Sequence, residues 1–276
     1  MKKWSLLIDT KDEKGLIHKI TGVLFYQNLN VLQTKEFVDN DNNRFYMRCE
    51  LEGDVNQEAI LQKLEELIPA AKLSLCECKR KDIVIMVTKE SHAIGDILIK
   101  HEFGDLNANI KAVIGNHKNL QDLVEKFNIP YIYVSHEDKS REQHEQEIRK
   151  VIDSYAPDFV VLAKYMRILT SDFIAGLENK IINIHHSFLP AFIGANPYKQ
   201  AHQRGVKIIG ATAHFVNNDL DEGPIIYQNV VPVDHTMTWQ DMMSLGRDVE
   251  KTVLSNALKL VFEDKVFVYQ NKTVIL

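Results

Sequence analysis

Residues 181–190 read IINIHHSFLP, an apolar run that passes directly into Asn183 and His185 and then turns at Pro190. The run is typical of a buried strand, and residues two apart on a strand lie on the same side of it. In open parallel sheets, ligands bind outside the carboxyl ends of the strands. The sequence therefore predicts that Asn183 and His185 reach into a pocket.

Short apolar segments alternate with helical patterns on the N-terminal side of this stretch. Strands are expected at residues 83–88, 110–114, 131–134, 159–162 and 181–184, with helices around 94–100, 120–127 and 139–155. This rhythm predicts an α/β domain with a Rossmann-like, mostly parallel sheet and right-handed crossovers. Near the end of the chain, Thr238 and Asp241 form a capping-box pattern, which predicts the start of a long amphipathic helix.

The first eighty residues have a different pattern, with strands at 4–8, 31–38, 44–51 and 72–78 and helices near 16–24 and 60–68. The order predicts a ferredoxin-like βαββαβ unit. In 44–51, apolar residues alternate with Arg44, Tyr46, Arg48 and Glu50, which predicts one face in water. A charged hinge at 79–82 separates the two patterns, so we expect two domains, residues 1–80 and 83–276.

Composition excludes several classes of protein. The 276 residues include 33 basic and 38 acidic side chains, a net charge of −5 that offers no field to hold a nucleic acid. No apolar run approaches the roughly 20 residues that span a bilayer, and the N-terminus does not resemble a signal peptide. Three clustered cysteines do not form a disulfide framework. We expect a cytoplasmic protein with neither nucleic acid nor membrane as a partner.

Residues 210–226, GATAHFVNNDLDEGPII, add His214, Asp221 and a Gly-Pro turn to the pair on the earlier strand. Asn, His and Asp at one site favour acyl transfer without a covalent intermediate. An amide N–H and a protonated imidazole both stabilise an oxyanion, and one such donor contributes roughly 3 kcal/mol. A carboxylate favours the imidazolium and orients a water molecule. Asn183, His185 and Asp221 are therefore the candidate catalytic residues.

Other chemistry fits these residues less well. His185, His186, His202, His214 and Asp221 lack the tight spacing of hydrolytic zinc sites, so we expect no metal. Ser187 lacks the G-x-S-x-G elbow of a nucleophile, and a hydrogen bond that shapes the loop is the expected role. Cys76 and Cys78 suggest no redox or metal function.

Three strings resemble the folate-dependent formyltransferase family: NIHHSFLPAFIG from 183, GATAHFVNNDLDEGPII from 210 and LAKYMRIL at 162–169. The resemblance implies catalysis by Asn183, His185 and Asp221, with the Asp seven residues beyond His214. It also implies that 10-formyltetrahydrofolate is a substrate and that no cofactor is needed. The residues it implies for binding that substrate are Met166, Arg167, Ile168, Leu169, His214, Asn217 and Asp219; His214 is expected to be a pocket wall or an orienting partner.

The acceptor of the formyl group depends on residues 88–95, TKESHAIG. Transferases that use a ribonucleotide hold its phosphate on a glycine-rich turn at this place, whereas Glu90 here repels a phosphate. The pattern, with PYKQA at 197–201 and RGVK at 204–207, resembles the formyltetrahydrofolate deformylases; Gly115 departs from their usual Ser. The resemblance implies hydrolysis to formate and tetrahydrofolate, which supplies formate for purine synthesis and balances the one-carbon folate pool. Formyl transfer to an amine and a folate-binding regulator without activity remain the alternatives.

Deformylases also carry a leading ACT domain, and DEKGLI at 12–17 is similar to the turn where ACT domains hold a small amino acid. The resemblance implies an effector site at Asp12, Gly15 and Leu16, with glycine or methionine as the effector. ACT domains commonly pair edge to edge, so a homo-oligomer is expected.

Overall fold

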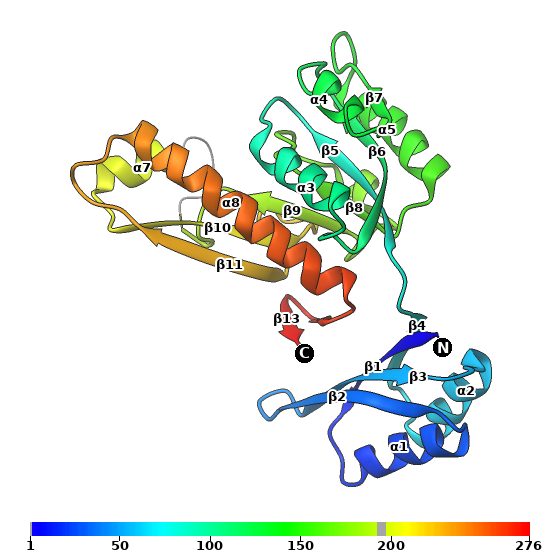
Figure 1. Cartoon of the computed structure of the whole chain (residues 1–276). Coiled ribbons are helices and arrows are strands. Elements are labelled where there is room, and N and C mark those ends of the chain that lie inside the picture. The colour runs from blue at the N-terminus through cyan, green and yellow to red at the C-terminus, as the bar shows by residue number, and fades with distance from the viewer. Residues whose placement is uncertain (1, 192–196) are drawn as a thin grey trace. The chain divides into compact units, whose positions relative to one another are not determined.

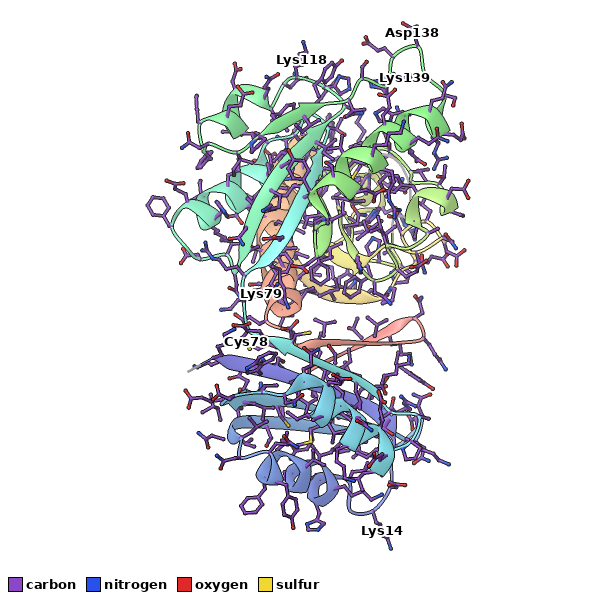
Figure 2. The ribbon with its side chains drawn as sticks, turned by 90° about the vertical axis from the view of Figure 1, so that its right-hand side faces the viewer. Lys14, Cys78, Lys79, Lys118, Asp138 and Lys139 are labelled. Atoms are coloured by element: carbon purple, nitrogen blue, oxygen red, sulfur yellow. The ribbon has the colours of Figure 1, made fainter. Side chains whose placement is uncertain are left out.

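The computed structural model describes residues 2–191 and 197–276, and its elements are shown in Figure 1. The chain forms two compact units. The first contains Met1–Lys79, Glu263–Tyr269 and Val274–Leu276, and the second contains Arg80–Phe262 and Gln270–Thr273. The chain leaves the first unit at Cys78 and Lys79 (Figure 2), which is where the charged hinge was expected. Within the described residues, no helix is long and apolar enough to cross a membrane.

The first unit has an antiparallel sheet in the order β2-β3-β1-β4, the ferredoxin-like arrangement that the apolar spacing predicts. Leu6, Leu24 and Leu64, from a strand and both helices, are completely buried in one core between the sheet and the helices. The elements are β1 (Lys3–Lys11), α1 (Leu16–Tyr26), β2 (Asn30–Asp39), β3 (Arg44–Glu52), α2 (Gln57–Leu67) and β4 (Lys72–Glu77).

The middle of the second face of β3 is buried, so the prediction that this face meets water was wrong at Tyr46 and Arg48. Tyr46 is 0% and Arg48 4% exposed. The guanidinium of Arg48 donates to the carbonyl oxygens of Glu263 and Asp264, both at 2.9 Å, and the ring of Tyr46 lies 5.5 Å from that of Phe267. The cover comes from the far end of the chain, which local periodicity does not reveal.

The C-terminal segment changes the limit of the second domain, which was predicted to run from 83 to 276. Residues 263–269 and 274–276 group with the first unit, and Glu263, Asp264 and Phe267 contact β3. Two strands that were not predicted, β12 (Val266–Tyr269) and β13 (Lys272–Ile275), pair with each other here.

The second unit has a seven-stranded sheet in the order β11-β10-β9-β8-β5-β6-β7. β5 to β9 are parallel, whereas β10 and β11 are antiparallel additions at one edge, so the mostly parallel sheet is confirmed. The elements are β5 (Lys81–Val87), α3 (His92–Glu102), β6 (Ala108–Gly115), α4 (Gln121–Glu125), β7 (Tyr131–Tyr133), α5 (Arg141–Tyr155), β8 (Phe159–Leu162), α6 (Ser171–Ile174), β9 (Ile181–His185), α7 (Pro197–Arg204), β10 (Ile208–Phe215), β11 (Ile225–Pro232) and α8 (Trp239–Phe262).

The order of strands reverses at β5, which pairs with β6 on one edge and β8 on the other. Loops that leave such a switch point diverge and open a crevice beyond the carboxyl ends of the strands. Glu90, Lys164 and His186, which follow β5, β8 and β9, line one cavity there. The sheet topology thus places the cavity.

The long helix α8 begins at the predicted capping box. The backbone N–H of Thr238 donates to Asp241 Oδ2 at 2.9 Å, and the backbone N–H of Asp241 donates to Thr238 Oγ1 at 3.2 Å. α8 crosses the sheet beside β10 and β11 (Figure 1). It brings Met243, Arg247 and Glu250 to the same cavity.

Candidate active site

Asn183 and His185 both line a cavity of about 560 Å³, as their spacing on the strand predicts. β9 carries them, and the antiparallel pairing sets Asn183 opposite His214 and His185 opposite Thr212 on β10. The register therefore brings the second histidine beside the first two predicted residues, although residues 208–215 had not been predicted as a strand.

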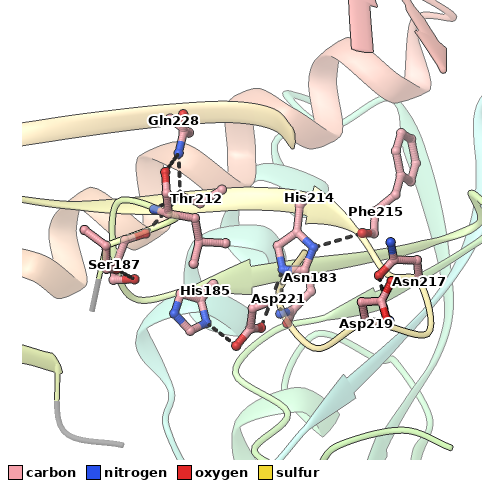
Figure 3. Close-up of polar contacts among 12 residues, drawn as sticks. Asn183, His185, Ser187, Thr212, His214, Phe215, Asn217, Asp219, Asp221 and Gln228 are labelled. Carbon is pink, nitrogen blue, oxygen red and sulfur yellow. Dashed lines mark hydrogen bonds and ion pairs between the residues drawn. The ribbon is translucent and has the colours of Figure 1, made fainter. Parts of the chain in front are cut away.

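Asp221 forms an ion pair with His185, with Asp221 Oδ2 3.2 Å from His185 Nδ1 (Figure 3). Burial by itself raises the pKa of Asp221, but the hydrogen bond and the charge of His185 outweigh it and lower that pKa below its ordinary value. Asp221 has φ 57°, in the left-handed region, a strain that is typical of functional loops. His185 Nε2 is buried and has no partner among the described residues. One imidazole nitrogen is thus held by a carboxylate while the other remains available.

His214 orients the amide of Asn183. Its Nδ1 lies 2.9 Å from the carbonyl oxygen of Phe215, which accepts only, so Nδ1 carries the proton. Burial lowers the pKa of His214, so the ring is neutral and Nε2 is an acceptor. That acceptor lies 3.2 Å from Asn183 Nδ2, which fixes the N–H side of the amide and leaves its second N–H for another partner.

The loop after β9 is held by hydrogen bonds of the Ser187 and Thr212 hydroxyls. Ser187 Oγ donates to the carbonyl oxygen of Ala191 at 2.8 Å, which confirms the expected role of Ser187 in shaping the loop. Thr212 Oγ1 donates to the carbonyl oxygen of Ser187 at 2.9 Å and accepts from the backbone N–H of Leu189 at 3.0 Å (Figure 3). The last residues of the first matching string, 192–194, lie outside the described residues.

The substrate-binding residues predicted from the resemblance all line the same cavity. The exposed side chains of Met166 and Ile168, 56% and 55% exposed, lie in the loop that follows β8. The loop that follows β10 contains Asp221, continues to the start of β11 at Ile225 and lines the same cavity. The predicted residues that line the cavity are Met166, Arg167, Ile168, Leu169, His214, Asn217 and Asp219.

A second polar cluster, centred on Glu250, lines the cavity and was not predicted. Glu250, which is 1% exposed, accepts from Tyr198 Oη at 2.7 Å, from His92 Nε2 at 2.8 Å and pairs with Lys164 Nζ at 3.1 Å. Burial opposes the charge, but the bond from His92, the charge of Lys164 and the bond from Tyr198 lower the pKa of Glu250 to about 2. Nearby, burial lowers the pKa of His186 to about 4, so its ring is neutral.

Glu90 stands at the place where a phosphate-binding turn would be needed. Its carboxylate lies 3.4 Å from Arg247 Nε and 3.5 Å from His92 Nδ1, at the start of α3. An acidic group at this helix start opposes an anion. The cation of Arg247 is already paired with it.

In the first unit, Gly15 has φ 87° and precedes α1, a conformation that favours glycine. The side chain of Leu16 is 2% exposed and belongs to the core, so only its backbone is open to a ligand. The backbone N–H of Asp12 donates to the carbonyl oxygen of Asn43 at 3.1 Å. The predicted effector residues therefore lie on the turn that leads into α1.

Residues 81–258 match the formyl transferase family. The formyltetrahydrofolate deformylase of Haemophilus influenzae is 56% identical over 277 residues, 100% of this chain and 100% of that protein. The chain belongs to the formyltetrahydrofolate deformylase family. A second deformylase, from Escherichia coli K12, is 57% identical over 96% of this chain and 95% of its own length.

Solved structures separate the deformylase family from formyl transferases. A formyltetrahydrofolate deformylase from Pseudomonas syringae has a TM-score of 0.95 at 37% identity and covers 100% of this chain and 94% of its own. The glycinamide ribonucleotide transformylase from Symbiobacterium toebii has a TM-score of 0.68 at 28% identity and covers 71% of this chain and 94% of its own. Of these two structures, the deformylase covers the whole chain, whereas the transformylase leaves more than a quarter of it unmatched.

Proposed function

We propose that this chain hydrolyses 10-formyltetrahydrofolate to formate and tetrahydrofolate. The observation that carries the proposal is the His185–Asp221 pair beside Asn183, in the cavity of a chain that resembles deformylases over its whole length. We assign catalysis to these three residues. The formate would supply purine synthesis in the cytoplasm and balance the one-carbon folate pool.

The proposed chemistry follows from the hydrogen bonds of the site. Asp221 accepts a hydrogen bond from Nδ1–H of His185, and its negative charge favours the imidazolium form, whose Nε2–H donates to the formyl oxygen. The second N–H of Asn183 donates to the same oxygen, because His214 occupies the first. Water that Asp221 orients attacks the formyl carbon, the bond from carbon to N10 breaks, and N10 takes up a proton. No step requires a cofactor.

We place the pterin between two loops of the second unit. Met166, Arg167, Ile168 and Leu169 supply one wall, and the other is supplied by Asn217, Asp219 and His214. Glu90 and its pairing with Arg247 disfavour a phosphorylated acceptor, which supports water rather than a ribonucleotide amine.

We also propose that the first unit is a regulatory ACT domain. Glycine or methionine would bind at the turn of Asp12, Gly15 and Leu16, and β2 at the edge of the sheet would pair with a second copy. Effector binding would then change the rate of hydrolysis.

The test is formate release from 10-formyltetrahydrofolate with no amine present, with and without added glycine or methionine. We expect equal amounts of formate and tetrahydrofolate, at a rate that one amino acid changes. Release that requires an added amine would instead indicate a formyltransferase. Folate binding without turnover would indicate a regulator, and an unchanged rate would contradict the effector assignment alone.

A further inference from the structure

Lys164 is a buried cation in the wall of the cavity. It follows β8 and is 5% exposed, and its φ of 62° lies in the left-handed region that side chains other than glycine rarely adopt. Such strained residues cluster at sites that bind ligands or substrates. The strain therefore directs attention to what the side chain does.

The Glu250 cluster holds this ammonium but does not use all of its hydrogens. Tyr198 donates to one carboxylate oxygen of Glu250, and His92 and Lys164 share the other. Lysine has three N–H donors and no lone pair. Within residues 2–191 and 197–276, Glu250 is the partner of Lys164 Nζ, so further N–H groups can bond only to what enters the cavity. A buried donor without a partner is unfavourable.

The cluster lies close to the catalytic pair. The ring of His186 stacks on that of His185 with centroids 5.1 Å apart, and its centroid lies 6.2 Å from that of the Tyr198 ring. Tyr198 in turn donates to Glu250. The Lys164–Glu250 pair thus lines the same cavity as His185 and Asp221, and the contacts of His186 and Tyr198 connect the two groups.

We propose that Lys164, held by Glu250, makes water the acceptor of the formyl group. The inference rests on the proposed hydrolysis. A water oxygen has two lone pairs, so it can accept a hydrogen bond from Lys164 with one and attack carbon with the other. A primary amine has a single lone pair, and accepting from Lys164 removes its nucleophilicity. A group that only donates therefore selects water.

The atoms balance both in hydrolysis and in transfer to an amine. In hydrolysis the water oxygen bonds to the formyl carbon, the bond from carbon to N10 breaks, N10 takes one proton, and formate and tetrahydrofolate leave. In transfer to an amine, the nitrogen bonds to the same carbon, N10 takes a proton from the amine, and a formamide leaves with tetrahydrofolate. Without Lys164, the carboxylate of Glu250 can accept the N–H of an amine and orient its lone pair.

The experiment measures how the formyl group divides between water and glycinamide. Purified full-length chain, as wild type and as Lys164→Met and Lys164→Arg, is given 10-formyltetrahydrofolate and glycinamide. Formate and N-formylglycinamide are quantified for each turnover. Lys100→Met is the matched control, because Lys100 is also paired, with Asp96 and Ser255, on α3 away from the cavity.

We expect wild type, Lys164→Arg and Lys100→Met to give formate only, since arginine also only donates. Lys164→Met should release formate about 10- to 100-fold more slowly and should form N-formylglycinamide. The ratio of products is independent of the amount of folded protein. Lys164→Met that yields formate alone, at any rate, overturns the inference. A wild type that releases no formate contradicts the proposed function instead.

Discussion

Asp221, which is half-buried, and Glu250, which is buried, are two carboxylates on one cavity, each bonded to a histidine and each with a lowered pKa. They differ in how completely their surroundings are paired. The partner of Asp221, His185, keeps Nε2 without a bond among the described residues, whereas both oxygens of Glu250 and its partner Tyr198 are bonded. The carboxylate of Glu250 is thus fully paired, and Lys164 is the member of its cluster that keeps N–H groups for the cavity, whereas the Asp221 pair leaves the imidazole nitrogen of His185 for the reacting group.

The largest effect should come from Asp221→Asn, which changes the pair of Asp221 and His185. An amide can present its N–H to His185 Nδ1, which shifts the imidazole proton to Nε2 and removes the charge that supports the imidazolium. We expect kcat for formate release to fall roughly a thousandfold or more, with the fold unchanged. Asp234→Asn, whose carboxylate bonds Thr236 elsewhere in the unit, controls for the substitution itself. Turnover close to wild type would show that Asp221 has no catalytic role.

Removing the charge of Glu250 should lower the stability of the folded chain. The pKa of Glu250 is lowered from 4.5 to about 2, so its charge stabilises the folded chain above about pH 4.5, and that contribution is lost as pH falls toward 2. The shift corresponds to about 3 kcal/mol. Urea unfolding should show Glu250→Gln less stable than wild type by about this amount at pH 5, and by about half as much at pH 3.

Glu147→Gln is the matched control for this pH dependence. Its side chain is 46% exposed and pairs with Lys139 on the surface, where ion pairs contribute little. We expect its difference from wild type to be small at both pH values. If Glu250→Gln differed from wild type in unfolding free energy by the same amount at pH 5 and pH 3, packing and not charge would explain its lower stability.

The two clusters also differ in how far the sequence predicts them. Asn183, His185, His214 and Asp221 stand at strand ends and at fixed spacing within two short segments, so local pattern reveals them. Glu250 lies within a helix, seven residues before Ala257 and on the same buried face. An acid in an apolar stripe is a signal that it is buried with partners, but the pattern of the helix does not say which residues those partners are.

The same distinction holds for the fold. The βαββαβ order and the parallel strands follow from periodicity within each segment. The buried face of β3 depends on contacts of Arg48 with Glu263 and Asp264, and no local pattern records a contact between segments so far apart. Lys164 was missed for a related reason, since only the pairing with Glu250 distinguishes it from a solvated lysine beside the predicted pterin wall.

The smallest effect sharpens the role of His214, which was predicted to bind substrate. Its Nε2 orients Asn183, so His214→Phe should leave one N–H of that amide without a partner and lower kcat about 10- to 100-fold, with KM little changed. Asn183→Ala and the variant that carries both substitutions complete a double-mutant cycle. Because His214 is expected to act through Asn183, the double variant should be no slower than Asn183→Ala alone. Additive losses of kcat, or a rise in KM with kcat preserved, would show that His214 contacts the substrate directly. The pairing of β9 with β10 would then be what orients Asn183.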